Sequence, residues 1–362
     1  MGSDKKVRVG IIGVGGIANG KHMPNLAKIE NVEMVAFCDL IRERAEEGAR
    51  KYGTHDAEVF TDYRDLLKVK DIDVVHVCTT NDAHSYITVD ALEAGKHVMC
   101  EKPMAINSEE AKKMVDAAKR TGKKLTIGYQ NRFRPDSQYL KQLCDNGELG
   151  EIYFAKALAV RRRAVPTWGS FLDEEKQGGG PLIDIGTHAL DLTLWMMNNY
   201  EPEMVVGTTY HKLGSRKNAA NAWGPWDPDK FTVEDSAFGF VKMKNGATII
   251  LEASWALNTL QIGEAMTVLC GTEAGADMLD GLRINGEKYS RLYTTKPELE
   301  TGGVAYFEGN SSDPGEVEAR QWIDAVVNDK EPVVKPEEAY VVSQILEAIY
   351  KSAKSGQPVY FK

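Results

Sequence analysis

Apolar and polar positions alternate along the first third of the chain in blocks that predict a strand, then a helix, several times over. Short apolar runs predict buried strands at 7–12, 34–38, 73–78, 97–100 and 125–128. Amphipathic segments between them predict helices at 41–52, 62–68, 85–95 and 107–122, the last with Asn107 and Glu110 spaced as a capping box. This alternation is typical of a doubly wound parallel sheet of the Rossmann type.

The later part of the chain has a different pattern. Strands are predicted at 152–161, 205–210, 234–243, 247–256 and 265–270, and helices at 136–145, 317–328 and 336–355. Asn245-Gly246 between two of these strands is a hairpin signal, so this second sheet is expected to contain antiparallel pairs. We therefore predict a dinucleotide-binding domain at 1–128 and a substrate-binding and oligomerisation domain at 129–362.

The first predicted strand ends in a glycine-rich loop that predicts phosphate binding. Gly13 permits a tight turn, Gly15 lets the backbone approach a pyrophosphate, and Ala18 allows the following helix to pack closely. Asp39 follows the second strand, about 20 residues beyond the loop, where an acid binds the ribose hydroxyls. A carboxylate there repels a 2′-phosphate, so NAD is expected over NADP, although Asp39 could also be a simple turn residue.

Polar residues follow two further predicted strands. Thr80, Asn81 and His84 come where the strand at 73–78 gives way to a helix, and such strand ends form the ligand crevice of a doubly wound sheet. Local packing is the alternative role for His84. Lys102 follows the strand at 97–100, and Pro103 holds it in an extended conformation. Its ammonium group could stabilise a developing alkoxide on a substrate, or it could be an ordinary surface lysine.

The segment 178–191, GGGPLIDIGTHALD, carries the main candidate for acid–base chemistry. Asp184, His188 and Asp191 have the spacing i, i+4 and i+7, so on a helix they share one face. A carboxylate one turn from a histidine can orient the imidazole for general acid–base catalysis. A polar helix stripe is the plain alternative, and two ligands one turn apart do not make a metal site, so no metal is predicted. The three glycines predict a loop that approaches a ligand closely.

Other candidates for substrate contacts lie just after the strand at 152–161. Arg161 and Arg163 alternate, so in an extended chain they point the same way and could bind an anionic or heavily hydroxylated substrate. Trp168 could stack on a sugar ring. A solvated edge and a packed loop anchor are the alternatives, and the tryptophan-rich segment 221–227 is a further candidate rim of the substrate site.

Composition narrows the possible partners and the compartment. The formal charge of −9, without a basic arm, argues against nucleic acid, and no apolar run approaches the ~20 residues of a membrane span. The five cysteines form no CxxC pair, which indicates a reducing cytoplasm rather than a disulfide framework. A wide sheet face needs cover, so a homo-oligomer (dimer or tetramer) through the C-terminal sheet is expected.

Taken together, the glycine loop, Asp39, the residues 79–84, Glu101-Lys102-Pro103, the run 128–133 and the segment 178–191 resemble the Gfo/Idh/MocA oxidoreductases over nearly the whole chain. The resemblance implies a Rossmann domain followed by an α/β domain with a large open, mainly antiparallel sheet. It implies that Lys102, Asp184 and His188 are catalytic. It also implies cofactor contacts at a set of residues in the first domain: Gly13, Gly15, Gly16, Ile17, Asp39, Thr80, Asn81, His84, Glu101 and Lys102.

The predicted function is an NAD(P)-dependent oxidation of a secondary alcohol on a sugar, sugar derivative or cyclitol. His188 would take the hydroxyl proton, Lys102 would donate to the same oxygen, and Asp184 would orient the group. Two alternatives stay open at this point. Some relatives use bound NAD for a transient oxidation that ends in glycoside cleavage with no net redox change, and the fold also allows a dinucleotide sensor without catalysis.

Overall fold

The computed structural model describes residues 6–299 and 313–361. The described chain divides into two compact units. Unit 1 contains the described residues within 1–133 and 311–340, and unit 2 contains those within 134–310 and 341–362. Each unit has its own sheet and its own helices.

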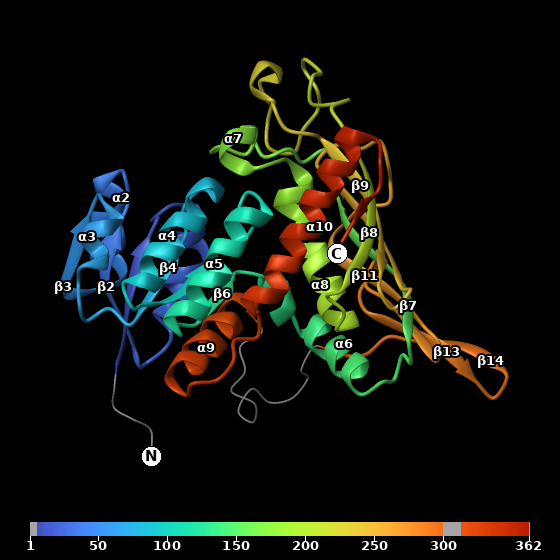
Figure 1. Cartoon of the computed structure of the whole chain (residues 1–362), viewed down its shortest axis with the longest axis horizontal. Helices are drawn as coiled ribbons and strands as arrows, with labels where there is room; N and C mark the ends of the chain where they lie inside the picture. Colours follow the sequence, from blue (N-terminus) through green and yellow to red (C-terminus); the bar gives the residue numbers. More distant parts are fainter. Residues whose placement is uncertain (1–5, 300–312, 362) are drawn as a thin grey trace. The chain divides into compact units, whose positions relative to one another are not determined.

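Unit 1 is built on a parallel sheet with β1 near its centre (Figure 1). In the described residues its six strands have the order β3-β2-β1-β4-β5-β6, and every neighbouring pair is parallel. This is the strand order of the Rossmann fold and confirms the predicted architecture. The strands are β1 (Val7–Ile12), β2 (Val32–Cys38), β3 (Gly53–Phe60), β4 (Val74–Val77), β5 (His97–Cys100) and β6 (Leu125–Ile127).

The edge strand β3 is an element that the apolar pattern does not predict. Its sequence, GTHDAEVF, is polar, and none of its residues is fully buried. Because an edge strand pairs on one side only and faces solvent on the other, it needs no apolar run to form. Its pairing with β2 through the backbone defines it instead.

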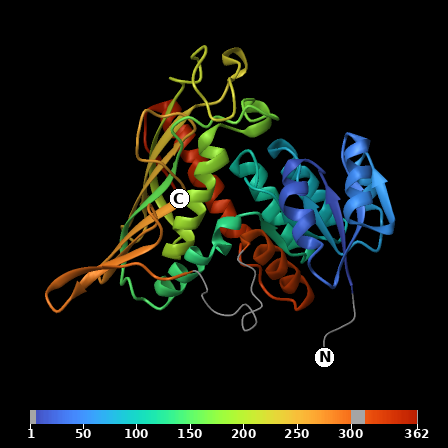
Figure 2. The same cartoon turned by 180° about the vertical axis from the view of Figure 1, so that it is seen from behind.

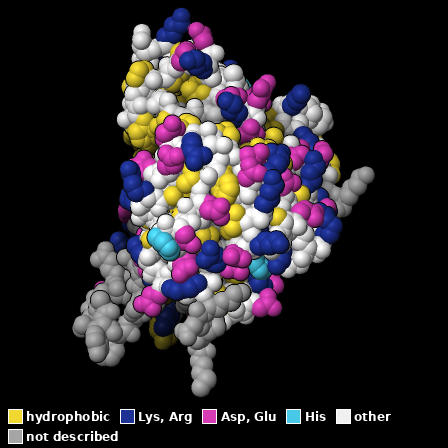
Figure 3. All heavy atoms as spheres, turned by 90° about the vertical axis from the view of Figure 1, so that its left-hand side faces the viewer, with side chains coloured by type: hydrophobic (Ala, Val, Ile, Leu, Met, Phe, Trp, Pro, Cys, Tyr) yellow, Lys and Arg dark blue, Asp and Glu magenta, His cyan; other side chains and the backbone are white. Residues whose placement is uncertain are grey.

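The helices of unit 1 follow the predicted alternation. They are η1 (Ala18–His22), α1 (Met23–Leu26), α2 (Arg42–Tyr52), α3 (Tyr63–Leu67), α4 (Asn81–Glu93), α5 (Ser108–Thr121), η2 (Gln130–Phe133) and α9 (Pro314–Val327). The side chain of Asn107 accepts a hydrogen bond from the Glu110 amide at 2.9 Å, so the predicted N-cap of α5 is confirmed. On the face drawn in Figure 3, which views the molecule from the side of α2 and α3, Lys and Arg side chains are interspersed with Asp and Glu.

Unit 2 is built on a wide, mainly antiparallel sheet, as predicted. Its nine strands in the described residues have the order β14-β13-β12-β11-β7-β10-β9-β8-β15, and only the pair β7 and β10 is parallel. The turn at Gly246, whose φ is +90°, connects β9 to β10 and confirms the predicted hairpin. The strands are β7 (Ile152–Val160), β8 (Pro202–Tyr210), β9 (Ser236–Met243), β10 (Thr248–Ser254), β11 (Gly263–Gly271), β12 (Ala274–Asp277), β13 (Arg283–Lys288), β14 (Arg291–Thr295) and β15 (Val359–Tyr360).

The two faces of this sheet differ. Helix α8 (Thr187–Met197) and the C-terminal part of α10 (Pro336–Ser355) lie on the same side of it (Figure 2). A Cβ at Gly207 or Gly239 would meet Ile349 at 2.6 Å, so α10 packs directly on β8 and β9. On the opposite face Val206 and Phe240 are register partners and are 38% and 40% exposed. The shorter helices of unit 2 are α6 (Pro135–Asp145), α7 (Glu174–Gln177), η3 (Leu182–Gly186) and η4 (Pro228–Lys230).

No helix in the described ranges has the length and apolar character that a membrane span requires.

Candidate active site

The glycine loop after β1 is shaped by two different requirements. Gly13 has a φ of +86°, and a Cβ there would lie 2.5 Å from the carbonyl oxygen of Cys78, so packing against the end of β4 demands glycine. A Cβ at Gly15 or Gly16 would meet no protein atom within 4 Å. These two glycines therefore leave open space outside the loop, which is the space that a pyrophosphate needs if the backbone is to approach it.

Asp39 lies just past β2 and is fixed against this loop. Its Oδ2 accepts a hydrogen bond from the Val14 amide at 2.8 Å, and its Oδ1 accepts one from the Ile41 amide at 2.9 Å. The carboxylate is thus held at the carboxyl end of the sheet, beside the glycine loop. Loop and carboxylate together fit the pyrophosphate and ribose of a dinucleotide.

The predicted residues after β4 lie where α4 begins. Thr80 precedes the helix, Asn81 is its first residue, and His84 is buried in its first turn. The Nδ1 of His84 lies 2.8 Å from the Pro103 carbonyl oxygen, and its Nε2 lies 3.2 Å from that of Thr79. His84 therefore links the segment after β4 to the segment that carries Lys102. Burial lowers the pKa of His84, so its imidazole is neutral at pH 7.

Glu101 is buried directly before Lys102 and has several partners. Its Oε1 lies 2.5 Å from Lys21 Nζ and 2.8 Å from His22 Nε2, and its Oε2 accepts a hydrogen bond from the Lys102 amide at 3.0 Å. A Cβ at Gly128 would lie 2.9 Å from the same carboxylate, so that position must stay small. Glu101 thus fixes the backbone from which the Lys102 side chain projects.

Glu318 and His76 complete this buried network, and neither was predicted from the sequence. Lys21 also pairs with Glu318 at 3.0 Å, and His22 Nδ1 lies 2.9 Å from His76 Nδ1. His76 is a lone histidine in the apolar strand β4, which is a recognisable sign of a buried polar contact. Glu318 is 217 residues from Glu101 in the printed numbering, and no local pattern connects the two.

Burial and charge act in opposite directions in this network. Burial raises the pKa of Glu101, but Lys21 and His22 outweigh it and hold that pKa well below its usual range. Burial, together with the charge of Glu101, raises the pKa of Glu318 to about 7, against the attraction of Lys21. Burial, together with the nearby Lys21, lowers the pKa of both His22 and His76. The network therefore contains one firmly ionised carboxylate and two neutral imidazoles.

In unit 2 the helix-compatible part of the segment 178–191 begins with a wider turn. Residues Leu182–Gly186 form a π-helical turn that leads into α8, and Asp184 lies within it. Such turns occur often at functional sites. Asp184, His188 and Asp191 are all buried, and Asp184 Oδ2 accepts a hydrogen bond from the Trp255 indole N–H at 3.0 Å. Arg161 Nη1 lies 3.9 Å from the same oxygen.

The three glycines at 178–180 lie in tight surroundings: Gly178 is the left-handed C-cap of α7, and the other two are closely packed. A Cβ at Gly179 would collide with the Tyr350 hydroxyl, and one at Gly180 would collide with the Glu234 carbonyl. The Glu234 carboxylate accepts hydrogen bonds from the Gly180 amide at 2.9 Å, the Leu182 amide at 3.1 Å and the Tyr350 hydroxyl at 2.8 Å. Gly179 and Gly180 thus allow close protein packing. Glu234 holds the start of the helix that carries Asp184, and the sequence analysis missed it.

The two predicted arginines have separate partners. Arg161 pairs with Glu264, with Nε 2.8 Å from Oε2, in addition to its contact with Asp184. Arg163 donates to the Asn258 side chain at 2.5 Å and to the Arg162 carbonyl at 2.6 Å. Trp168, which is 52% exposed, lies with its ring centroid 4.9 Å from that of Trp223. Lys102 belongs to unit 1, whereas Asp184, His188, Arg161, Arg163 and Trp168 belong to unit 2.

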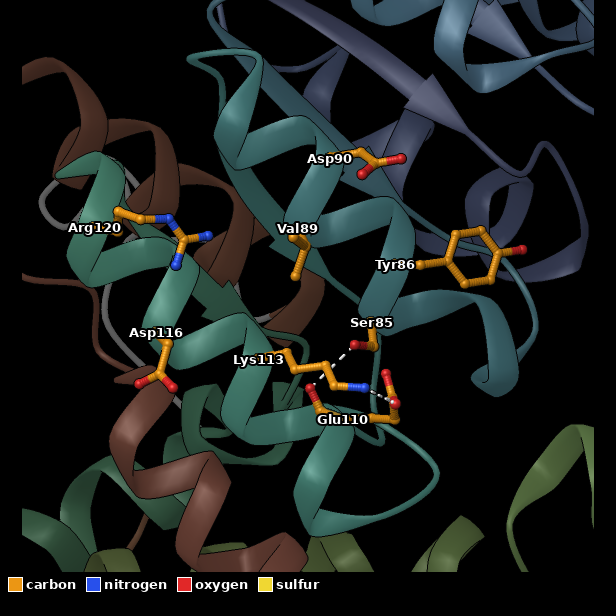
Figure 4. A pocket seen from close by; sticks show the side chains of 8 residues that line it. All are labelled: Ser85, Tyr86, Val89, Asp90, Glu110, Lys113, Asp116 and Arg120. Atoms are coloured by element: carbon orange, nitrogen blue, oxygen red, sulfur yellow. Dashed lines mark hydrogen bonds and ion pairs between the residues drawn. The ribbon is translucent and has the colours of Figure 1, made fainter.

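A groove on the surface of unit 1 contains none of these residues. It is formed between α4 and α5, and its lining includes Tyr86, Asp90 and Lys113 but none of the predicted site residues (Figure 4). Lys113 pairs with Glu110 at 2.5 Å, so charge in the groove is compensated internally. Among the residues that the structure describes, no three His, Cys, Asp or Glu side chains gather as ligands for a metal ion.

Both domains of the chain are similar in sequence to known proteins. The family model for the NAD-binding Rossmann fold of the Gfo/Idh/MocA oxidoreductases matches residues 7–129, and the model for the C-terminal domain of that family matches residues 137–277. D-glucoside 3-dehydrogenase from Escherichia coli is 37% identical over 354 residues, which cover 98% of this chain and 97% of that protein.

Two other relatives are more distant. Inositol 2-dehydrogenase from Salmonella typhimurium is 31% identical over 194 residues, which cover 53% of this chain and 55% of that enzyme. The structure of levoglucosan dehydrogenase in complex with NADH and levoglucosan has the same fold, with a TM-score of 0.82 and 22% identity over 98% of this chain and 99% of that one. The chain therefore belongs to the Gfo/Idh/MocA family, and it is an NAD(H)-binding oxidoreductase that acts on CH–OH groups.

Proposed function

We propose that the protein oxidises a secondary hydroxyl group of a sugar, a sugar derivative or a cyclitol and transfers the hydride to NAD. The observation that carries this proposal is the similarity to D-glucoside 3-dehydrogenase along nearly the whole chain. Inositol 2-dehydrogenase, which matches about half of the chain, supports including cyclitols. A glucoside oxidised at its C3 hydroxyl is the first substrate to test.

Lys102, Asp184 and His188 are the proposed catalytic residues. His188 takes the proton of the substrate hydroxyl as a general base, Lys102 donates a hydrogen bond to the same oxygen, and Asp184 orients the hydroxyl. Bound nicotinamide supplies the hydride acceptor. The Trp255 indole and the Arg161 guanidinium both face the Asp184 carboxylate, which supports a fixed, ionised group at that position. The Glu101 carboxylate likewise supports a fixed backbone at Lys102.

The cofactor is proposed to bind to residues at the carboxyl ends of the strands of unit 1. Asp39, held by the Val14 and Ile41 amides, supports a preference for NAD, since its charge would repel the 2′-phosphate of NADP. Residues 1–128 then serve as the dinucleotide domain and 129–362 as the substrate domain, although the described part of 311–340 folds with unit 1. The proposed contact residues are Gly13, Gly15, Gly16, Ile17, Asp39, Thr80, Asn81, His84, Glu101 and Lys102.

The substrate is proposed to contact Arg161, Arg163 and Trp168. A homo-oligomer, either a dimer or a tetramer, is proposed to form through the open face of the C-terminal sheet, where Val206 and Phe240 are partly exposed. Cytoplasmic location is proposed because all five cysteines are free thiols, as a reducing compartment allows.

The proposal is tested by a panel of sugars, glucosides and cyclitols, each with NAD and with NADP, followed at the absorbance band of reduced nicotinamide. Methyl and 4-nitrophenyl glucosides should produce NADH in proportion to the glucoside consumed. Release of 4-nitrophenol without accumulation of NADH would instead identify the NAD-dependent glycosidase reaction. Tight NADH binding with no turnover across the whole panel would identify a dinucleotide sensor.

A further inference from the structure

Six side chains of unit 2 form a closed ring that begins and ends at Asp184. One arm runs from Asp184 through the Trp255 indole N–H, at 3.0 Å, to Phe171, whose ring centroid is 6.4 Å from that of Trp255. The other arm runs through Arg161, at 3.9 Å, to Trp223, whose ring centre is 5.1 Å from the guanidinium. Trp168 closes the ring, since its centroid is 5.9 Å from Phe171 and 4.9 Å from Trp223.

Sheet topology explains why these residues meet. β7 and β10 pair in parallel, so their carboxyl ends lie at the same edge of the sheet. Arg161 directly follows β7, and Trp255 directly follows β10. The loops that carry Trp168 and Trp223 extend from this edge, and Asp184 lies on η3, which also contacts β7 and β10. The edge therefore places aromatic side chains around the predicted catalytic carboxylate.

The two ends of the ring differ in exposure. Trp255 is fully buried at the Asp184 end, whereas Trp168 and Trp223 are 52% and 44% exposed at the other. The planes of these two indoles meet at 74°, so they form the two walls of a corner. Two large aromatic side chains left half in water, and linked through Arg161 to the proposed catalytic Asp184, are a feature of a binding surface rather than of a core.

The corner is held in shape by the protein itself. The Asn221 side chain accepts a hydrogen bond from the Val165 amide at 2.8 Å and donates one to the Val165 carbonyl at 2.9 Å. Thr167 donates to the Trp223 carbonyl at 2.8 Å. These bonds join the loop of Trp168 to the loop of Trp223, so a ligand does not have to order them on binding.

Charge around the corner favours a neutral ligand. Arg161 already has two carboxylate partners, Glu264 and Asp184, and its guanidinium stacks on Trp223. An anionic substrate would have to compete with both carboxylates for the Arg161 guanidinium. An aryl group or the C–H face of a pyranose ring, by contrast, is complementary to an indole surface.

We infer that the corner of Trp168 and Trp223 is a binding subsite for the part of a neutral glycoside beyond the oxidised ring, an aryl group or a second sugar. This inference rests on the proposed function, because it takes the oxidised ring to lie at Asp184. The Asp184 end of the side-chain ring then serves the reacting sugar, and the Trp168 and Trp223 end selects among its glycosides.

The test compares methyl and 4-nitrophenyl D-glucopyranosides, as both anomers, by calorimetric binding to the NADH-loaded protein and by KM and kcat. Wild-type protein should bind the 4-nitrophenyl glucoside more tightly. Trp168→Ala and Trp223→Ala should each weaken that binding about tenfold or more, with a loss of less than about threefold for the methyl glucoside. Trp168→Phe should retain most of the affinity for the 4-nitrophenyl glucoside. In the two alanine variants kcat/KM for this glucoside should fall through a higher KM and not through a lower kcat.

Tyr139→Ala, which removes a partly exposed ring on α6, is the matched control and should leave the affinity for both glucosides unchanged. Equal losses for the two glucosides, no loss for either, or failure of the wild type to bind 4-nitrophenyl glucoside would each overturn the inference. Tight, tryptophan-dependent binding in a protein that oxidises no sugar or cyclitol would support the subsite and refute the proposed function. Oxidation of cyclitols without glucoside binding would support the proposed function and refute the subsite.

Discussion

At the scale of single residues, the proposed chemistry depends on one amine and one imidazole. We predict that Lys102→Ala and His188→Ala each lower kcat by ~10²–10⁴-fold, because each removes a group that transfers or shares a proton at the substrate oxygen. NADH affinity, followed by fluorescence, should change little for His188→Ala. Exposed residues of the same types provide controls, and His55→Ala and Lys70→Ala should behave as wild type. Turnover near the wild-type rate in either active-site variant would remove that residue from the mechanism.

A second residue-scale prediction concerns cofactor choice. Asp39→Asn removes the charge but keeps an oxygen that can accept the Val14 or Ile41 amide. We expect the ratio of kcat/KM with NADP to kcat/KM with NAD to rise about tenfold or more, because the repulsion of the 2′-phosphate is lost. The ratio is the right measurement, since any general loosening of the loop affects both cofactors. An unchanged ratio would show that Asp39 does not discriminate between them.

At the scale of elements, Glu234 is expected to fix the helix that carries Asp184. Glu234→Gln replaces one acceptor oxygen with an NH₂ group that faces N–H donors, so about 1–3 kcal/mol of stability should be lost. Because the Gly180 and Leu182 amides lie just before Asp184, kcat should fall more than KM rises. Tyr350→Phe removes only one of the three hydrogen bonds and should have the smaller effect on both thermal unfolding and kcat.

The buried network of η1, β4 and Glu101 predicts a dependence of stability on pH. Burial lowers the pKa of His22 and His76 below the ordinary value of 6.5, so the folded state takes up protons at lower pH than the unfolded state does. Stability should therefore fall as pH drops through 6.5, by up to ~1.4 kcal/mol per pH unit for each histidine. His76→Gln should make this slope shallower in urea unfolding curves measured between about pH 5 and pH 7.5.

Glu318 acts in the opposite direction in the same network. Its pKa is raised to about 7, so the stability it contributes is greatest at acid pH and is lost as pH rises through that value. Glu318→Gln should therefore remove a loss of stability between pH 5 and 7, the rough range between the unfolded and folded pKa values. A curve with the same shape as wild type in this variant would show that Glu318 does not titrate there.

Some elements of the fold could be predicted from the sequence, and others could not. Strands with apolar runs, the glycine loop and the hairpin at Gly246 have local patterns, because burial on both faces or a positive φ restricts the residue types. β3 has no such pattern, since it is a polar edge strand. Partners far apart in sequence, such as Lys21 with Glu318 or Gly179 with Tyr350, depend on packing that no local pattern records. The packing of Gly179 on Tyr350 of α10 could therefore not be predicted from the segment 178–191 alone.

The ring of six side chains that begins and ends at Asp184 also depends on contacts that no local sequence pattern predicts. Trp168 and Trp223 were recognisable as separate candidates, but their meeting depends on the parallel pair β7 and β10 and on the Asn221 hydrogen bonds. Arg161 was expected to suit an anionic or a heavily hydroxylated substrate. Its pairing with Glu264, a residue on a strand more than a hundred positions later, could not be predicted from the local pattern.

At the scale of the whole molecule, the open face of the C-terminal sheet predicts self-association. Val206, Phe240 and Ile250 lie in one row across β8, β9 and β10, and the row continues through Lys156 on β7 to Val268 on β11. Apolar side chains in such a row are costly to leave in water, and a second copy of the same face would bury them. The wild-type protein should therefore behave as a dimer or tetramer in light scattering coupled to gel filtration.

Phe240→Glu places a charge in the middle of this row without touching the face covered by α10, where Ile349 packs. We expect this variant to shift to smaller species, because a dimer related by two-fold symmetry would bury two such charges near each other. Tyr289→Glu, on the exposed turn after β13, is the control and should keep the wild-type assembly. All six side chains of the ring that begins and ends at Asp184 lie outside this row. A Phe240→Glu variant that is monomeric but still binds glucosides would therefore show that assembly and substrate recognition are separate. A wild-type protein that is monomeric at all concentrations would show that this face is stable in water by itself.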